Sequence, residues 1–223
     1  MGTAAVRIIC LGRQDRSDRA SAVLCEASEL GADTVHALPK KIDGASSFDQ
    51  GSIDWRRSLS SSHWLLNCSS TVLEGDSSKW AWGASMAFAE LEGSRSAMLV
   101  EVPPRPEMMA EAWGAVIERI RQIHLLFIEH DALDAIAEIE GIKPERLLAS
   151  IRQRSLVPLV CSYDPSSREA RIEHVFGVTE VVTDISMSAE SWLAAFLCEL
   201  PQTGPGGEGI QMAAKVQVKK NKR

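Results

Sequence analysis

Hydrophobic and polar residues follow two alternating patterns along the chain. Short runs of leucine, aromatic and β-branched residues, such as RIICL and HWLLNC, are typical of buried strands. Longer segments with an apolar residue at every third or fourth position are typical of amphipathic helices. The predicted strands cover residues 6–11, 63–68, 97–102, 124–128, 156–162 and 170–176, and residues 181–200 predict a strand, a polar turn and a helix. Strands that alternate with helices form parallel βαβ units, so we expect a parallel sheet with helices on both faces.

Start and stop signals place helices between these strands. Gly31 and Gly93 each follow an apolar periodic segment, and glycine reaches the left-handed backbone that ends a helix. Pro144 stands at a typical first-turn position. The stretch 35–54 shows neither pattern and is expected to be a loop. The predicted helices cover residues 17–30, 76–91 and 107–122, with two more between residues 129 and 155.

The C-terminal part departs from the parallel pattern. A DPSS turn separates the runs 156–162 and 170–176, which predicts an antiparallel hairpin and therefore a mixed sheet. The stretch PQTGPGGEG from Pro201 is rich in glycine and proline, and the last nine residues include five basic ones. We therefore expect one domain over residues 1–200, followed by a linker and a basic tail over residues 201–223.

The composition is that of an ordinary globular protein. The 223 residues are 45% hydrophobic and 24% charged, with a formal net charge of −6. A chain of this length buries a sizeable core. A general nucleic-acid binder would need a basic face, so we expect no nucleic-acid partner. No apolar run approaches the length that crosses a bilayer, so we expect no membrane partner.

Cysteine usage indicates the compartment. Most of the cysteines stand in apolar runs, and no CxxC pair or Cys/His cluster with zinc spacing occurs. Buried, reduced thiols are the expected state, because free cysteine is among the most buried residue types. We therefore predict no metal ligands and a reducing, cytoplasmic location. The five cysteines are Cys10, Cys25, Cys68, Cys161 and Cys198.

The turn before the last long helix carries the first candidate chemistry. In α/β sheets, ligands bind outside the carboxyl ends of the strands, where helix N-termini offer free N–H groups and a positive dipole end. The segment DISMSAESWLAAFL, residues 184–197, resembles the DTxGAGD turn and apolar helix of the PfkB/ribokinase family of carbohydrate kinases. Met187 and Ala189 stand at the two glycines, Ser188 at the alanine and Glu190 at the final aspartate.

Other stretches resemble the same family in the same order. Residues 46–70 are similar to a segment of 2-dehydro-3-deoxygluconokinase-like members in which a DW pair precedes a strand. LVEVPPRP, residues 99–106, is similar to DxNxRP, with Glu101 at the aspartate and Arg105 retained.

The resemblance implies a fold and an activity. The fold is a three-layer α/β/α ribokinase-like sheet, mostly parallel, with an antiparallel hairpin near the C-terminus. The activity is ATP-dependent phosphorylation of a sugar or sugar acid, with ATP and Mg²⁺ as cofactors. Glu190 would then be the catalytic base, Met187, Ser188 and Ala189 would form the anion hole for the ATP phosphates, and Arg105 would contact an anionic substrate.

Two residues of the turn depart from what phosphoryl transfer needs, since transfer depends on positioning and on charge neutralisation. Met187 places a long side chain at a glycine position, and its plainer role is to pack into the former phosphate space. Glu190 moves the carboxylate by about 1 Å, a shift that can cost on the order of 100-fold in rate. Its plainer role is a first-turn acid stabilised by the helix dipole and by Ser188 as the cap.

The nucleotide and magnesium elements are also incomplete. LLFIEHDAL, residues 125–133, resembles the family's LxPNxxE segment, but Glu129 stands at the Asn position and Ala132 at the Glu position. The family's TLGxxG nucleotide loop falls near residues 161–167, which lack glycine. Arg105 follows two prolines and has the plainer interpretation of a solvated loop residue. We therefore expect weak or absent nucleotide binding.

The front of the family pattern is not recognised. RIICLGRQD, residues 7–15, resembles the family's RxxxxGxD strand, whereas its opening strand and GGxxxN segment are not found. A missing strand leaves unpaired backbone groups, so we expect a homo-oligomer or a protein partner, with strand addition as the mode. Two functions stay open: a sugar kinase with weak or lost activity, and a non-catalytic pseudokinase that acts as an interaction or regulatory module.

Overall fold

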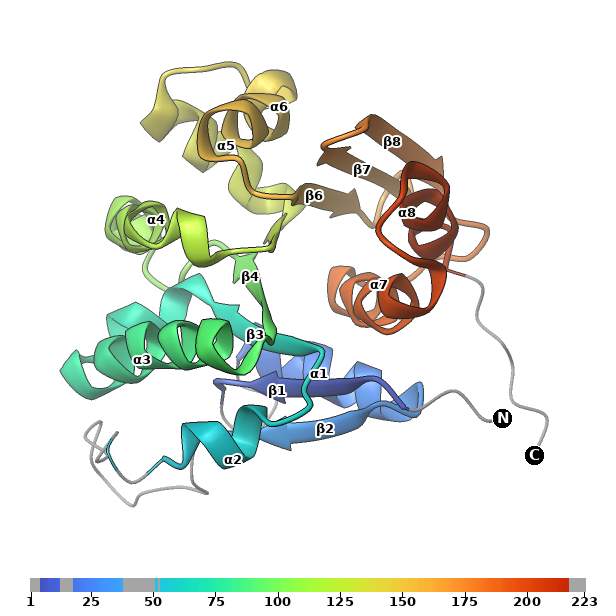
Figure 1. The fold of residues 1–223 in the computed structure, drawn as a ribbon. Coiled ribbons are helices and arrows are strands. Elements are labelled where there is room, and N and C mark those ends of the chain that lie inside the picture. Colours follow the sequence, from blue (N-terminus) through green and yellow to red (C-terminus); the bar gives the residue numbers. More distant parts are fainter. Residues whose placement is uncertain (1–4, 13–17, 38–50, 52, 217–223) are drawn as a thin grey trace.

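A single mixed sheet forms the centre of this computed structural model, which describes residues 5–12, 18–37, 51 and 53–216. Its eight strands follow the order β2-β1-β3-β4-β5-β6-β7-β8 (Figure 1). Pairing is parallel from β2 across to β6 and antiparallel between β6, β7 and β8. The strands are β1 (Arg7–Cys10), β2 (Asp33–His36), β3 (Trp64–Cys68), β4 (Arg95–Val100), β5 (Leu125–Ile128), β6 (Leu159–Asp164), β7 (Glu169–His174) and β8 (Gly177–Val182).

Helices cover both faces of the sheet, which confirms the predicted three-layer α/β/α fold with its C-terminal hairpin (Figure 1). One face carries α1 (Arg19–Glu29), α7 (Ala189–Thr203) and α8 (Gly207–Ala214). The other carries α2 (Trp55–Leu59), α3 (Asp76–Glu92), α4 (Met109–Glu118), α5 (His130–Glu140) and α6 (Pro144–Ser155). Short 3-10 turns are η2 (Ser69–Glu74), η3 (Pro106–Met108) and η4 (Ile120–Gln122).

Successive strand residues face opposite layers, so each strand contributes to two separate cores. In β1, Ile8 and Cys10 belong to the core beneath α1 and α7, whereas Ile9 belongs to the core beneath the other layer. The inner strands β3 and β5 are buried along their whole length. Such strands appear in the sequence as continuous apolar runs, which explains why the sequence pattern located them.

The prediction of a loop over residues 35–54 is wrong at its first residues, which belong to β2, and α2 directly after it was not predicted. β2 begins at Asp33 and pairs in parallel with β1, from Arg7 beside Asp33 to Cys10 beside His36. Asp54 caps α2, since its side chain accepts a hydrogen bond of 3.0 Å from the backbone N–H of Arg57. Both elements are too short to show a period in the sequence. The rest of the predicted loop, residues 38–50 and 52, lies outside the described residues.

The prediction of a linker that begins at Pro201 is also wrong. α7 continues through Pro201 to Thr203, and α8 follows, with its Ile210 buried against the core. A side chain at Gly209 would lie 2.3 Å from the carbonyl oxygen of Gly204. Glycine therefore allows the end of α7 and α8 to approach closely, which is a structural role and not that of a flexible linker. Residues 217–223 of the predicted basic tail lie outside the described residues.

The sheet has β2 and β8 at its edges, whereas β1 is paired on both sides. The chain therefore places its first described strand in the interior of the sheet. The absence of the family's N-terminal part stays a prediction. Strand addition as a consequence of that absence stays a prediction as well.

The cysteines are all free thiols in the structure. Cys10, Cys68 and Cys161 are buried, and Cys25 and Cys198 are half-buried. The predicted burial is confirmed for Cys10, Cys68 and Cys161, and the reduced state stays a prediction. Within the described residues, no helix combines the length and the apolar character that a membrane span requires.

Aromatic stacking holds α7 on the sheet. The ring of Trp192 is fully buried and stacks on Phe127 of β5, Tyr163 of β6 and Phe196 of its own helix, with centroids 5.8, 5.5 and 4.9 Å apart. Its Nε1 donates a hydrogen bond of 3.1 Å to the carbonyl oxygen of Ala214 in α8. One side chain therefore joins the sheet and two helices.

We expect Trp192→Ala to lower the free energy of unfolding by about 3–5 kcal/mol, because the change leaves a cavity and removes a buried hydrogen bond. Urea unfolding followed by circular dichroism measures the loss. Met212→Ala, on the exposed side of α8, is the matched control and should stay within about 0.5 kcal/mol of wild type. Equal losses in the two variants would contradict the central role of Trp192.

Candidate functional site at the carboxyl edge of the sheet

Three acidic side chains converge where parallel strands end. Glu101 follows β4, Glu129 follows β5, and Glu190 lies in the first turn of α7. Carboxyl ends of parallel strands meet at one edge of a sheet, and helices that follow such strands begin there. The sequence therefore brings together three residues that it separates by 28 and 61 positions.

Arg19 is the cation at the centre of this cluster. It is the first residue of α1, which Asp18 caps by accepting a 2.7 Å hydrogen bond from the backbone N–H of Ser21. Its Nη1 donates a hydrogen bond to a carboxylate oxygen of Glu190. Its Nε lies 3.6 Å from Glu101 Oε2 and 3.5 Å from Glu129 Oε1. The guanidinium thus contacts all three acids.

A close approach within the β1–α1 connection sets the position of Arg19. A Cβ atom at Gly12 would lie 2.8 Å from Cys10 Sγ and 2.9 Å from an oxygen of the Asp18 carboxylate. Glycine at this position therefore lets the end of β1 pass close to the N-terminal cap of α1. Arg19 follows the cap directly and projects into the acidic cluster.

Glu101 is held by donors from β3 and the turn after it. Its Oε1 accepts a hydrogen bond from Ser70 Oγ and one of 3.0 Å from Cys68 Sγ. Burial, followed by the charge of Glu101, raises the pKa of Cys68 well above its usual value. Cys68 is therefore a protonated thiol that donates to Glu101, and it is a poor nucleophile.

Glu129 is the acid with the most perturbed titration. It is 8% exposed, and its Oε1 has no hydrogen-bond partner among the described residues. Burial raises its pKa to about 7, and the charges of Glu101, Glu190 and Asp131 act in the same direction, while Arg19 opposes them. Near neutral pH this carboxyl therefore exists in both protonation states.

Glu190 shows the opposite behaviour. Burial acts to raise its pKa, but hydrogen bonds from its own backbone N–H and from Ser188, together with the Arg19 charge, outweigh burial and lower it. Ser188 is the N-terminal cap of α7 and accepts a 3.1 Å hydrogen bond from the backbone N–H of Ser191. The predicted cap is confirmed, and the predicted first-turn acid is in addition buried and ion-paired.

The pKa of Arg19 is shifted by the same groups. Burial acts to lower it, but the charges of Glu129, Glu190 and Glu101 raise it above its ordinary value. The guanidinium is therefore a permanent cation in this cluster. Its side chain is half exposed, so the cluster is open to solvent on the side of Arg19.

Of the remaining predicted site residues, Ser188 hydrogen-bonds to Glu190, whereas Met187 and Arg105 lie elsewhere. Met187 is partly buried and packs against the core beneath α7, together with Ala189. Arg105 is exposed in the loop after β4, immediately before η3. No structural observation assigns a ligand to Met187, Ser188, Ala189 or Arg105, so their roles stay predictions.

Residues 161–167, where the resemblance places a nucleotide loop, form the end of β6 and a closed turn. The Asp164 carboxylate accepts hydrogen bonds of 2.8 Å from the backbone N–H of Ser166, 2.7 Å from its hydroxyl and 2.9 Å from the hydroxyl of Ser167. The hydroxyl of Ser166 and the other donors of the turn hold the pKa of Asp164 down at about 2. The hydrogen-bond donors of Ser166 and Ser167 are therefore engaged by Asp164 within the turn itself.

The donor set does not fit a nucleotide with magnesium. Glycine is absent from both turns that the resemblance assigns to phosphate, and Ala132 carries no oxygen ligand at the position of the family's Glu. Across the described residues, no group of three or more His, Cys, Asp or Glu side chains is arranged to hold a metal ion. Instead, a protein cation occupies the centre of the three acids.

Sequence reasoning identified Glu101, Glu129 and Glu190 as departures from family positions but did not identify Arg19. A signal was present, because a cation in the first turn of a helix opposes the helix dipole and needs acidic partners elsewhere. Glu101 and Glu129, which each follow a buried strand, and Glu190 in the first turn of α7 supply those partners. Only the fold shows that all four belong together.

Neither a protein-family model nor a curated protein sequence matches the chain. Solved structures do match. A 2-dehydro-3-deoxygluconokinase from Thermotoga maritima aligns with a TM-score of 0.68 at 9% identity, over 96% of this chain and 92% of that chain. A fructokinase double mutant from Vibrio cholerae O395 with fructose, ADP and potassium bound aligns with a TM-score of 0.71 at 12% identity, over 96% and 90%.

A PfkB protein from Polaromonas sp. JS666 aligns with a TM-score of 0.61 at 14% identity, over 94% of this chain and 76% of that chain. The predicted resemblance to the PfkB/ribokinase sugar kinases is thereby confirmed in the fold. At these identities the likeness concerns the arrangement of the backbone. The chemistry of the site has to be argued from the residues of this chain.

Glu129 should make stability depend on pH. Because its folded-state pKa is raised to about 7 from 4.5, protonation favours the folded state. This contribution is fully present below about pH 4.5 and is lost as the pH rises through about 7. We expect the free energy of unfolding of Glu129→Gln minus that of wild type to grow by on the order of 2 kcal/mol between about pH 5 and about pH 8.

Urea unfolding at several pH values measures this difference. Burial lowers the pKa of His124 and of His174, which gives stability the opposite trend, but both residues are present in wild type and variant and cancel in the difference. Glu138→Gln, at an exposed position of α5, is the control and should show no such growth. A constant difference for Glu129→Gln would show that its carboxyl does not titrate in this range.

Proposed function

We propose that this chain is a pseudokinase: a carbohydrate-kinase-like protein that has lost phosphoryl transfer and acts as an interaction or regulatory module. The observation that carries the proposal is the ion pair between Arg19 and Glu190. By resemblance, Glu190 stands where the sugar kinases have the aspartate that removes the proton from the sugar hydroxyl. In this chain the carboxylate at that position, Glu190, is paired with the guanidinium of Arg19.

A general base has to be free to accept a proton. Glu190 is engaged by the guanidinium of Arg19 and by the donors of its helix terminus, and its pKa is lowered. A carboxylate with a lowered pKa is a weaker base, and one that must first break an ion pair is weaker still. The longer side chain of glutamate also displaces the carboxylate by about 1 Å relative to aspartate.

The charge of the site argues against nucleotide binding. Three carboxylates surround one guanidinium, so the four side chains carry a net negative charge even when Glu129 is protonated. Phosphoryl transfer needs cations that neutralise the transferred group. The acid cluster would repel the phosphates of ATP, and Met187 stands at a position where the family has glycine. ATP and Mg²⁺ are therefore not cofactors of the proposed function.

The retained fold supports a role in binding. The two cores lie on the two faces of the eight-stranded sheet, and large side chains such as Trp64, Trp113 and Trp192 are fully buried in them. A protein partner or a second copy of the chain is the proposed ligand class, and the predicted reduced state of the thiols supports the cytoplasm as its compartment.

A second candidate, a weak sugar kinase, is favoured by the position of Glu190. Its carboxylate remains in the first turn of α7 at the carboxyl edge of the sheet, where a base for a sugar or sugar-acid hydroxyl would stand. In that case Arg19 would be displaced on substrate binding, and Arg105 would be available for an acidic substrate. The two candidates differ in whether Glu190 takes part in chemistry.

We expect no phosphorylation of sugars or sugar acids by wild type, and no binding of MgATP at millimolar concentration, because the base is paired and the turns assigned to phosphate lack glycine. A coupled ADP-release assay with a sugar panel, together with calorimetry, measures both. Arg19→Ala should not create activity, since Met187 and Ala132 remain. Wild-type turnover that Glu190→Gln abolishes without changing the melting temperature would establish the kinase instead.

The ion pair should behave as a structural contact. In a double-mutant cycle of Arg19→Ala and Glu190→Gln, we expect a coupling energy of about 1–2 kcal/mol in the free energy of unfolding, because Glu190 is buried. The exposed pair Arg171–Glu180, with its 2.7 Å contact, is the control and should couple by less than about 1 kcal/mol. Zero coupling at Arg19–Glu190 would remove the observation that carries the proposal.

A further inference from the structure

The outward face of α3 carries an apolar stripe that no part of the described chain covers. Trp80 is 64% exposed and Leu91 is 73% exposed, and Ala87 between them is exposed as well. Ala84 lies on the same line but is half-buried and packs partly against the core. The helix lies between α2 and α4 in its layer (Figure 1), and the side opposite the stripe, which includes Trp82 and Met86, packs into the core.

The four stripe residues follow one line along the helix. Their spacings of four, three and four positions keep them on one side, since residues three or four apart are neighbours on a helix surface. Trp80 and Leu91 stand at the two ends of the line, and Ala84 and Ala87 stand in the middle. Large side chains at both ends and small ones at the centre give the surface a shape that fits a helix.

The order of the spacings is the same in both directions, which makes the stripe complementary to itself. If a second α3 lies antiparallel across it, Trp80 of one copy meets Leu91 of the other, and Ala84 meets Ala87. Each of the large residues then lies about 8 Å along the axis from the midpoint of the helix pair. The small central residues let the two backbones approach closely.

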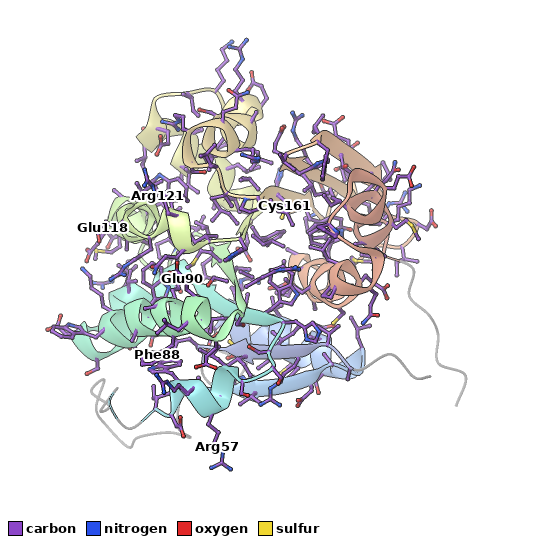
Figure 2. The ribbon with its side chains drawn as sticks, viewed as in Figure 1. Arg57, Phe88, Glu90, Glu118, Arg121 and Cys161 are labelled. Carbon is purple, nitrogen blue, oxygen red and sulfur yellow. The ribbon has the colours of Figure 1, made fainter. Side chains whose placement is uncertain are left out.

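The charges beside the stripe fit the same arrangement. Lys79 and Glu90 are exposed, and they are eleven positions apart, which is about three helical turns, so they lie on the same side of the stripe. Figure 2 shows Glu90 and Phe88 on opposite sides of α3. In the antiparallel pair, Lys79 of one copy lies beside Glu90 of the other, and the two-fold axis repeats this contact. Opposite charges therefore flank the apolar contact twice.

We infer that α3 is the contact surface of a two-fold symmetric homodimer, formed by antiparallel packing of the Trp80–Ala84–Ala87–Leu91 stripe. A single helix pair is smaller than the interface of a stable complex, which buries about 800 Å² per partner. The dimer is therefore weak, with a dissociation constant in the micromolar range. The inference does not depend on the proposed function, because α3 contributes no residue to the acidic cluster.

The edge strand β8 is the competing surface for self-association. It exposes Val178 and Val182 on one face, with Glu180 between them. The antiparallel register that pairs Val178 with Val182 of a second copy also sets the two Glu180 side chains opposite each other, and like charges directly opposite are destabilising. The α3 stripe has no such conflict, and we therefore prefer it to strand addition.

Sedimentation equilibrium of the full chain, from low micromolar to a few hundred micromolar, tests the inference. We expect a reversible monomer–dimer equilibrium for wild type. Trp80→Glu and Leu91→Glu should each weaken it by at least about tenfold, because each replaces a large apolar side chain of the buried contact with a charge. Both positions are exposed in the monomer, so the melting temperature of the diluted protein should change little.

Two controls and a charge exchange make the test specific. Met212→Glu on α8 and Val178→Glu on β8 change exposed apolar residues elsewhere and should leave the equilibrium unchanged. Lys79→Glu and Glu90→Lys should each weaken the dimer roughly three- to tenfold, and the double variant should restore it. A wild type that stays monomeric, or a dimer that only Val178→Glu disrupts, would overturn the inference.

Discussion

Charge compensation at the carboxyl edge of the sheet is the constraint on which the rest of the site depends. Three carboxylates that are mostly removed from water cannot share one small region without a cation or a proton. Arg19 supplies the cation, and the raised pKa of Glu129 shows that a proton supplies part of the remainder. This chain therefore balances the charges at this edge with its own side chains.

This balance requires that α1 and α7 lie side by side. Ser191 Oγ in α7 donates a 3.1 Å hydrogen bond to Glu26 in α1, and Trp64 Nε1 in β3 donates a 2.9 Å hydrogen bond to the carbonyl oxygen of Leu197. These contacts hold α7 against both α1 and the sheet. The aromatic stack around Trp192 holds the same helix on strands β5 and β6 of the sheet. The ion pair between Arg19 and Glu190 is thus a consequence of helix packing and not of local sequence.

A fold that many sequences can adopt explains why structural comparison succeeds where sequence comparison does not. Layer packing and sheet order depend on hydrophobic pattern and volume, which many sequences satisfy. Phosphoryl transfer depends on a few residues in fixed positions. By resemblance to the family motifs, Met187, Glu190 and Ala132 depart from the residues expected at such positions.

The sequence by itself determined the class of fold, because continuous apolar runs and helical periods are local consequences of burial. It also determined the mixed sheet, since the DPSS turn specifies the hairpin of β6 and β7, and the cap at Ser188. It did not determine β2, α2 or α8, which are short or begin in a glycine-rich stretch. Only the tertiary structure decided that Arg19 contacts Glu190 across 171 positions of the chain, because a pairing between distant charges follows from which helices pack together and leaves no periodic trace in the sequence.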